Sequence, residues 1–128
     1  MECKKIVIVD DEMHIRSLLE QTLEELDDEF DLELFTACDG EEGLELILRE
    51  KPDLVFLDVM MPKMNGYDVC QSVKKDPAMK NTIVILLTAK GQEIDRKHGI
   101  EVGALKYMTK PFDPDEILDK AIELLELE

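Results

Sequence analysis

The fold is decided by an apolar run that ends in three acids, Lys5-Ile6-Val7-Ile8-Val9-Asp10-Asp11-Glu12. Such a short run, rich in β-branched residues and closed by acids, is typical of a buried strand. Four more runs of strand length follow, separated by segments with helical period and by turn residues. We predict strands at Lys5–Asp10, Leu32–Cys38, Leu54–Asp58, Ile83–Thr88 and Ala104–Thr109. Strands that alternate with helices in this way predict an α/β domain built on a parallel sheet.

The first and last helices have the clearest signals. After the acidic turn, apolar residues recur three and four positions apart and form one stripe, Ile15, Leu18, Leu19, Leu23 and Leu26. The last helix has a complete start signal, with Asp113 as N-cap, Pro114 at the first position and Glu116 at the third. We therefore expect the first helix to follow the acidic turn and the last helix to begin at Pro114.

The remaining elements carry weaker signals. Asp39 begins the second helix, and the third covers about Tyr67 to Lys75. The fourth, at about Gln92–Val102, contains Gly99 and few apolar anchors, so we expect its local stability to be low. The run Leu32–Cys38 alternates between apolar and polar residues, which predicts an edge strand.

Composition limits the class of protein. The chain has 128 residues, 45% of them hydrophobic, and 15 basic against 31 acidic residues give a net charge of −16. One domain over residues 1–128 is expected, in the cytoplasm and without membrane insertion, because the longest apolar run is only Ile83–Leu87. The acidic excess argues against direct binding of nucleic acid.

The cysteines and histidines are not assigned to the site. Cys3, Cys38 and Cys70 form no C-x-x-C pair, so we interpret them as reduced thiols. His14 and His98 are interpreted as surface residues rather than metal ligands.

Polar and charged side chains lie where the predicted strands end, which is where ligands bind in an open parallel sheet. These residues carry carboxylates, a hydroxyl and an amine: Asp10-Asp11-Glu12, Asp58, Thr88 and Lys110. Neighbouring carboxylates repel by about 3 kcal/mol per pair at ~5 Å unless a cation lies among them. Because the candidate ligands are hard oxygens, Mg²⁺ is expected, or Mn²⁺ in its place.

Four ordered motifs resemble the receiver domains of two-component response regulators, with the single-domain chemotaxis regulator as the simplest relative. They cover residues 6–12, 53–66 (Asp-Leu-Val-Phe-Leu-Asp-Val-Met-Met-Pro-Lys-Met-Asn-Gly), 85–89 (Ile-Leu-Leu-Thr-Ala) and 107–112 (Tyr-Met-Thr-Lys-Pro-Phe). The resemblance implies a doubly wound (βα)5 fold with the flavodoxin-like strand order 2-1-3-4-5. It further implies a phosphorylation-dependent switch that is no enzyme but assists its own phosphorylation and dephosphorylation.

The resemblance also implies roles for individual residues. Asp58 would accept a phosphoryl group from a sensor histidine kinase or a phosphotransfer protein. Asp10, Asp11, Asp58 and the backbone carbonyl of Met60 would hold the metal ion. Lys110 would pair with Asp58 or with the phosphoryl group.

The switch implied by the resemblance joins Thr88 to Tyr107. Thr88 would bond a phosphoryl oxygen, Tyr107 would rotate inward, and the surface of the fourth helix, fifth strand and fifth helix would control a downstream protein.

A monomer or a phosphorylation-dependent dimer is expected. The Lys110–Pro111 peptide is predicted to be cis, and Met60 and Lys90 occupy the positions that tune dephosphorylation in the family. Gly43 stands where the family more often has alanine, at a cost of about 1 kcal/mol in helix preference.

Two other functions remain as alternatives. A magnesium-dependent phosphohydrolase would use Asp10 as nucleophile and Glu12 as general acid, but this short chain leaves little room for a cap. A receiver-like interaction module would never take phosphate. Flavin or dinucleotide binding is disfavoured because no glycine-rich phosphate loop follows the first strand.

Overall fold

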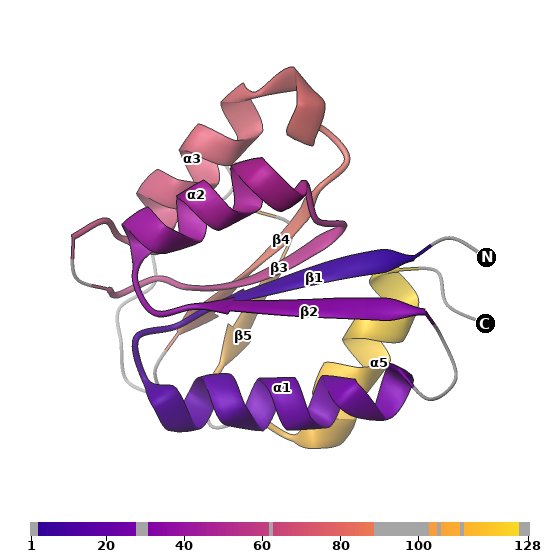
Figure 1. Cartoon of the computed structure of the whole chain (residues 1–128). Helices are drawn as coiled ribbons and strands as arrows, with labels where there is room; N and C mark the ends of the chain where they lie inside the picture. The colour runs from indigo at the N-terminus through magenta and orange to yellow at the C-terminus, as the bar shows by residue number, and fades with distance from the viewer. Residues whose placement is uncertain are drawn as a thin grey trace.

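The computed structural model describes residues 3–27, 31–61, 63–88, 103–104, 106–110 and 112–125. Its centre is a parallel sheet of five strands in the order β2-β1-β3-β4-β5 (Figure 1). The strands are β1 (Lys4–Val9), β2 (Leu32–Ala37), β3 (Leu54–Asp58), β4 (Ile83–Thr88) and β5 (Lys106–Thr109). The predicted fold class and strand order are confirmed, and β2 lies at an edge as its alternating pattern predicted.

Helices cover both faces of the sheet. On one face lie α1 (Met13–Asp27) and α5 (Pro114–Leu124), and on the other lie α2 (Gly40–Glu50) and α3 (Gly66–Lys75) (Figure 1). A short 3-10 helix, η1 (Pro77–Met79), precedes β4 where a turn was predicted. The predicted helix at Gln92–Val102, the Lys110–Pro111 peptide and Lys90 lie outside the described residues.

The strand residues divide between two apolar cores. In β1, Ile6 and Ile8 pack with α1 and α5, whereas Val7 and Val9 pack with α2 and α3. β3 and β4 alternate in the same way, and their residues are almost all buried. Continuous apolar runs are therefore needed in these strands, because both of their faces are covered.

The helices begin at polar caps that the sequence indicated. The side chain of Asp39 accepts a hydrogen bond from the Glu42 N–H at the start of α2, and Asp113 accepts one from Asp115 at the start of α5. The third helix starts at Gly66, one residue earlier than predicted, because the Asn65 side chain caps it. Each cap satisfies an amide that the first helical turn leaves without a partner.

Four strand bounds differ from the prediction, and the first is the start of β1, which lies at Lys4 rather than Lys5. β1 ends at Val9 rather than Asp10, because Oδ1 of Asp10 accepts the Glu12 N–H at 2.9 Å and turns the chain out of the sheet. β2 ends at Ala37 rather than Cys38. β5 begins at Lys106, while Ala104 lies before the strand.

Gly43 has a packing role that the helix preference alone did not indicate. It is buried in α2, and a Cβ atom placed on it would lie 2.6 Å from Cγ1 of Val9. The glycine therefore lets α2 approach β1 directly in front of the acidic turn.

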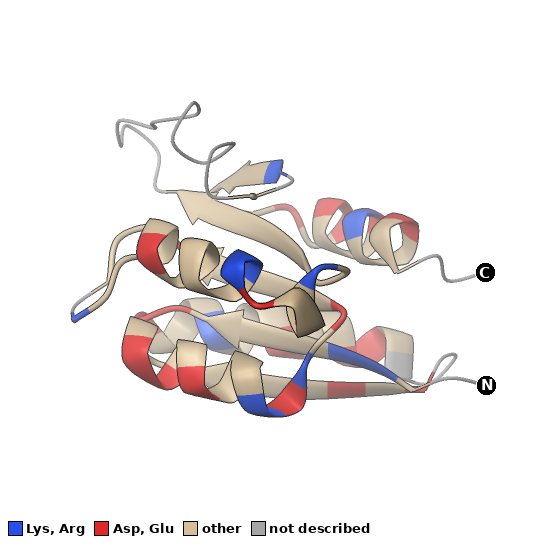
Figure 2. Cartoon of the chain, turned by 90° about the horizontal axis from the view of Figure 1, so that it is seen from above, with Lys and Arg blue, Asp and Glu red and all other residues tan. Residues whose placement is uncertain are grey.

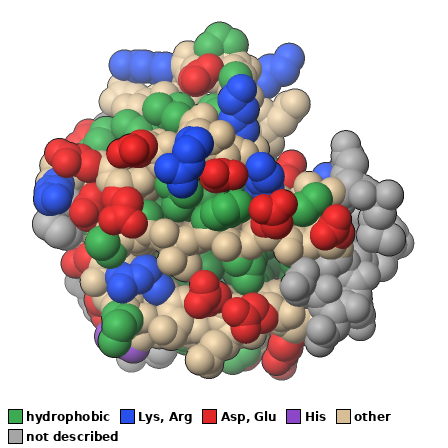
Figure 3. Space-filling view, viewed as in Figure 1, with side chains coloured by type: hydrophobic (Ala, Val, Ile, Leu, Met, Phe, Trp, Pro, Cys, Tyr) green, Lys and Arg blue, Asp and Glu red, His purple; other side chains and the backbone are tan. Residues whose placement is uncertain are grey.

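Charged residues lie mainly on the helices and near the strand ends, and the interior strands are almost free of them (Figure 2). On the face formed by α1, β2 and α2, acidic, basic and apolar side chains are interspersed (Figure 3). Within the described stretches, none of the helices combines the length and apolar character that a membrane crossing would need.

Candidate functional site

Two acids and an amine from three different strands meet at the carboxyl edge of the sheet. Asp10 follows β1 and is 0% exposed, and Asp58 ends β3 and is 4% exposed. Lys110 follows β5, and its side chain is 11% exposed. Charged groups are seldom this deeply buried unless they are paired, so these three form one electrostatic unit.

The hydrogen bonds of Asp10 leave one of its carboxylate oxygens paired only with the ammonium group of Lys110. The Asp10 N–H donates to the Ala37 carbonyl at 3.2 Å, and Oδ1 accepts the Glu12 N–H. Its buried Oδ2 has no partner with hydrogen-bond geometry among the described residues, although Lys110 Nζ lies 2.8 Å away. A buried carboxylate oxygen without a hydrogen bond is the kind of atom that a metal ion would satisfy.

Lys110 contacts three carboxylates at once. Its Nζ lies 2.8 Å from Asp10 Oδ2, 3.4 Å from Glu12 Oε1 and 3.6 Å from Asp58 Oδ2. Burial alone would lower the pKa of Lys110, but its contact with Asp10 and the nearby negative charges outweigh burial and raise it. The amine therefore stays protonated and holds the acids together.

Both buried acids resist ionisation. Burial raises the pKa of Asp10, although Lys110 and the Glu12 N–H oppose the shift. Burial, followed by the charge of Asp10, raises the pKa of Asp58 to about 7. One lysine is therefore insufficient to offset the desolvation and mutual repulsion of the acids, and a further cation would favour their charged forms.

Asp11 and Glu12 extend this acidic group toward solvent. Carboxylate oxygens of Asp10, Asp11 and Glu12 lie within 4.8 Å of one another. A side-chain hydrogen bond with Asp11 contributes to the raised pKa of Asp58, so these two carboxyl groups are neighbours. The oxygens of Asp10, Asp11 and Asp58 are thus the kind of hard ligand that a divalent cation prefers, and their assignment as metal ligands stays a prediction.

The backbone of the loop after β3 packs closely against Asp58. The Met60 N–H donates to Asp58 Oδ1 at 3.3 Å, and the Gly66 N–H donates to the Val59 carbonyl at 2.9 Å. A Cβ atom on Gly66 would lie 2.4 Å from the Asp58 carbonyl oxygen. Glycine is therefore needed where the loop closes, and Met60 is held beside the acid.

The same loop is also attached to the start of α2. Lys63 has a φ of 70°, and its Nζ lies 3.6 Å from Oδ2 of the cap residue Asp39. A Cβ atom on Gly40 would lie 1.9 Å from the Met64 carbonyl oxygen, so the loop backbone packs directly on the helix. These contacts fix the loop from outside the site.

The hydroxyl of Thr88 bonds to the neighbouring strand. It is 3.4 Å from the Met108 carbonyl oxygen and 3.3 Å from the Thr109 hydroxyl. The Lys110 N–H donates to the Thr88 carbonyl at 2.7 Å, which places Thr88 and Lys110 side by side. Tyr107 is partly buried against the core shared with α2 and α3.

The sequence prediction missed three contacts at the site. Arg16 donates from Nη1 to the main-chain carbonyl of Asp10 at 2.7 Å. Oε1 of Glu12 contacts Lys110, and Oε2 of the same residue lies 3.2 Å from His14 Nε2. An arginine within one to two turns of an acidic strand end is a usable signal, but the pattern does not show whether its side chain folds back.

A family model described as the response regulator receiver domain matches residues 6–122. The chain belongs to this family. A receiver domain is a phosphoacceptor signalling module rather than a classical enzyme, and it works as a phosphorylation-dependent switch in two-component systems. Family membership therefore decides against the phosphohydrolase alternative.

Curated relatives of this receiver domain include two named as transcriptional regulators. The probable transcriptional regulator ycf27 of Cyanophora paradoxa is 46% identical over 122 residues, which are 95% of this chain and 48% of that protein. The alkaline phosphatase synthesis transcriptional regulatory protein PhoP of Bacillus subtilis is 46% identical over 114 residues, 89% of this chain and 45% of that protein. The chain spans less than half the length of these relatives, so the expected single-domain architecture is not confirmed.

Solved structures share the fold over nearly the whole receiver domain. The chemotaxis response regulator CheY4 of Vibrio cholerae is 29% identical with a TM-score of 0.84, over 96% of this chain and 99% of that one. The receiver domain of sensor histidine kinase PA1611 from Pseudomonas aeruginosa, described with a magnesium ion in its active-site cleft, has a TM-score of 0.84 at 21% identity. The match covers 98% of this chain and 99% of that one, and at this identity it supports the fold.

Proposed function

We propose that Asp58 is the phosphoacceptor of this receiver domain. The observation that carries the proposal is the position of its buried carboxylate, between Asp10 and Lys110 at the carboxyl edge of the sheet. An Asp58 oxygen attacks the phosphorus of a phosphohistidine on a sensor kinase or phosphotransfer protein. A P–O bond forms as the P–N bond breaks, and the donor imidazole keeps the electron pair.

The acids around Asp58 would bind the divalent cation that this transfer needs. Asp10, Asp11, Asp58 and the backbone carbonyl of Met60 would hold Mg²⁺, or Mn²⁺ in its place, since each offers a hard oxygen. The ion would supply positive charge that offsets the negative charge of the transferring phosphoryl oxygens. The hydrogen-bond geometry missing at Asp10 Oδ2 supports this assignment, and so does the magnesium described for the PA1611 receiver domain.

Lys110, Thr88 and Tyr107 link the phosphoryl group to the output surface. Lys110 moves its ion pair from Asp10 and Asp58 to a phosphoryl oxygen, and Thr88 exchanges its bonds on β5 for another phosphoryl oxygen. The loss of those bonds frees the end of β5, and Tyr107 rotates inward. Because Lys110 and Thr88 belong to the receiver domain, the domain assists its own phosphorylation and dephosphorylation.

The partners follow from the chemistry and from the relatives. Exposed methionines flank the acidic site: Met13, 72% exposed, follows Glu12, and Met60, 63% exposed, lies two residues after Asp58. They offer an apolar contact surface to the phosphohistidine donor protein, which we expect to meet this domain in the cytoplasm. The named relatives are transcriptional regulators, which supports control of a DNA-binding output region by this domain, as a monomer or a phosphorylation-dependent dimer.

Intact-mass measurement after incubation with a small acyl phosphate and Mg²⁺ tests the proposal. We expect one added phosphoryl group on the wild-type chain and none on Asp58→Asn. Asp119→Asn, which changes an exposed acid on α5, is the matched control and should label normally. Equal labelling of Asp58→Asn, or labelling that excess chelator leaves unchanged, would contradict the assignment.

A further inference from the structure

The carbonyl of Asp10 has an unusual partner. β1 ends at Val9, and the Asp10 N–H still pairs with β2 through the Ala37 carbonyl. The Asp10 carbonyl instead accepts Nη1 of Arg16 at 2.7 Å, in a partly buried contact. A hydrogen bond from a charged donor at this distance is among the stronger ones in proteins, because one partner is ionised.

Arg16 lies where its charge does not favour the helix. It lies in the first turn of α1, four residues after Glu12, and its N–H donates to the Glu12 carbonyl at 3.1 Å. Positive charge near a helix N-terminus opposes the helix dipole, and the first turn of α1 contains no acid. The position of Arg16 is therefore better explained by its contact with Asp10 than by helix stability.

The contacted carbonyl belongs to the peptide unit that joins Asp10 to Asp11. With its N–H, its carbonyl and Oδ1 all bonded, Asp10 retains only Oδ2 for the site. The orientation of this peptide unit also sets the direction in which Asp11 leaves the chain. We propose that Arg16 is a positioning residue for the cation site, holding this peptide so that both carboxylates bind one divalent ion.

The inference rests on the proposed function and adds a residue that does not itself touch the ion. Electrostatics and positioning make opposite predictions for it. Removal of a positive charge beside an acidic cluster would by itself tighten binding of a divalent cation. Loss of positioning would weaken binding, and mutation of residues that orient ligands commonly costs about 10- to 100-fold in metal affinity.

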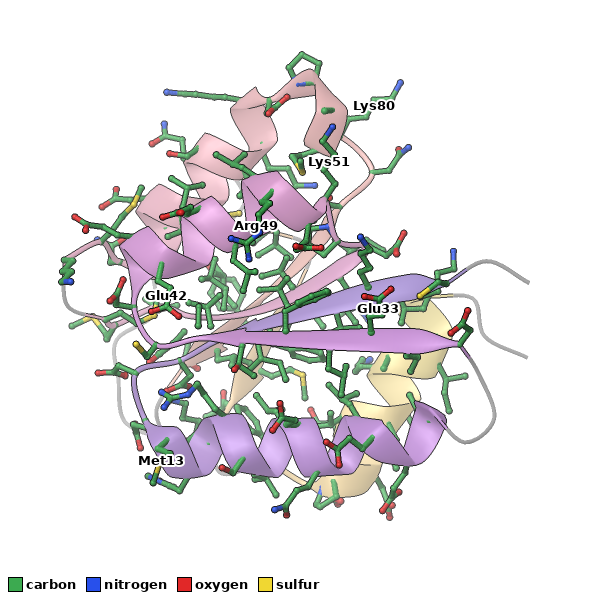
Figure 4. All side chains as sticks on the ribbon, in the orientation of Figure 1. Met13, Glu33, Glu42, Arg49, Lys51 and Lys80 are labelled. Atoms are coloured by element: carbon green, nitrogen blue, oxygen red, sulfur yellow. The ribbon has the colours of Figure 1, made fainter. Side chains whose placement is uncertain are left out.

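Calorimetric titration of the metal-free chain with MgCl2 separates these effects. The variants are Arg16→Met, Arg16→Lys and Arg49→Met. Arg49 is the matched control, because it is 62% exposed on α2, pairs with Glu50 and lies over β2 away from Met13 and the start of α1 (Figure 4). Each titration is made where circular dichroism shows the variant fully folded, so a change in stability alone does not alter the measured affinity.

We expect Arg16→Met to bind Mg²⁺ about tenfold more weakly and Arg49→Met to bind as the wild type does. Arg16→Lys keeps the charge and one donor and should recover part of the affinity. The Mg²⁺ concentration for half-maximal phosphorylation should shift with the dissociation constant, whereas the rate at saturating Mg²⁺ changes little. Binding by Arg16→Met that equals or exceeds that of the wild type overturns the inference.

Two further outcomes are distinguishable. If Arg16→Met does not fold, Arg16→Lys decides, because affinity equal to that of the wild type in this variant also overturns the inference. Asp11→Ala in the same titration tests the proposed site itself. Loss of binding in Asp11→Ala with unchanged binding in Arg16→Met contradicts the role of Arg16 alone, whereas unchanged binding in both contradicts the cation site and, with it, this inference.

Discussion

The ammonium nitrogen of Lys110 lies 2.8 Å from Oδ2 of Asp10, although β3 and β4 separate the strands that carry these two residues. The ion pair therefore spans the carboxyl edge of the sheet and passes Asp58, which ends β3. The amine and a divalent ion would share the same carboxylates, so the two cations compete. Each cation weakens the binding of the other to these oxygens.

The competition predicts that Lys110→Met binds Mg²⁺ more tightly but is phosphorylated more slowly. The variant removes a positive charge from the acids, and it also removes the group proposed to bind a phosphoryl oxygen. Without metal it should be less stable than the wild type by about 3 kcal/mol, since removal of one partner of a buried ion pair leaves uncompensated charge. Titration calorimetry, the rate of acyl phosphate labelling and urea denaturation in chelator measure the three effects.

Lys106→Met is the control for this prediction. Lys106 is also on β5, but its Nζ lies 3.8 Å from Glu123 Oε1 on α5, away from the acidic site. It should change none of the three measurements greatly. Weaker Mg²⁺ binding in Lys110→Met would show that the lysine organises the site rather than competing for it.

Asp11→Ala should weaken Mg²⁺ binding by more than about tenfold, because loss of a direct ligand should exceed the usual effect of losing an outer contact. Asp11 is exposed, so its removal should leave the free energy of unfolding of the metal-free chain unchanged or slightly higher. Calorimetric titration and urea denaturation in chelator test this pair of effects. A metal affinity equal to that of the wild type would remove Asp11 from the ligand set.

The sheet could be predicted because its pattern is redundant. Strands buried on both faces require continuous apolar runs, and these runs end in acids, with Asp10 directly after β1 and Asp58 as the last residue of β3. The caps Asp39 and Asp113 were visible for a similar reason, since cap residues act on amides only two or three positions away. Local signals of this kind survive without knowledge of the tertiary structure.

Contacts between distant segments could not be obtained in the same way. Nothing in the pattern around Lys63 indicates its positive φ or its pairing with Asp39, because these depend on where α2 lies against the loop. The fold of Arg16 back to Asp10 depends on a side-chain conformation that helical periodicity leaves open. For Thr88 the strand end was predicted, but its bonds to β5 required the register of two strands.

Gly43→Ala should destabilise the chain although alanine is the better helix former. The substitution gains about 1 kcal/mol in helix preference, but its Cβ would lie 2.6 Å from a methyl group of buried Val9. Overpacking of a rigid core commonly costs about 1 to 3 kcal/mol. We expect a net loss of about 1 kcal/mol in the free energy of unfolding, measured by urea denaturation.

A double-mutant cycle with Val9→Ala identifies the cause of that loss. Val9→Ala alone opens a cavity, and the methyl group added by Gly43→Ala would fill part of it. The double variant should therefore be more stable than the sum of the single effects predicts. Simple additivity would show that α2 moves to accept the new methyl group without contacting Val9.

The cap residue Asp39 should make stability depend on pH in the acid range. The hydrogen bond from the Glu42 N–H, and then the charge of Lys63, lower the pKa of Asp39 below its ordinary value. A lowered pKa means that the folded chain binds the proton less readily than the unfolded chain. The stabilisation is present above the unfolded pKa of about 3.9 and is lost as pH falls through the folded value.

Asp39→Asn keeps a good N-cap but cannot ionise, so it isolates this effect. Urea denaturation of both proteins from pH 7 to pH 2.5 should show a wild-type advantage that shrinks below pH 4, because the other acids titrate equally in both and cancel. In a Lys63→Met background the advantage should become smaller but persist, since the backbone hydrogen bond is the larger cause of the shift. An advantage that is constant over the whole range would mean that Asp39 caps α2 by geometry alone, and one that vanishes in Lys63→Met would assign the effect to the ion pair.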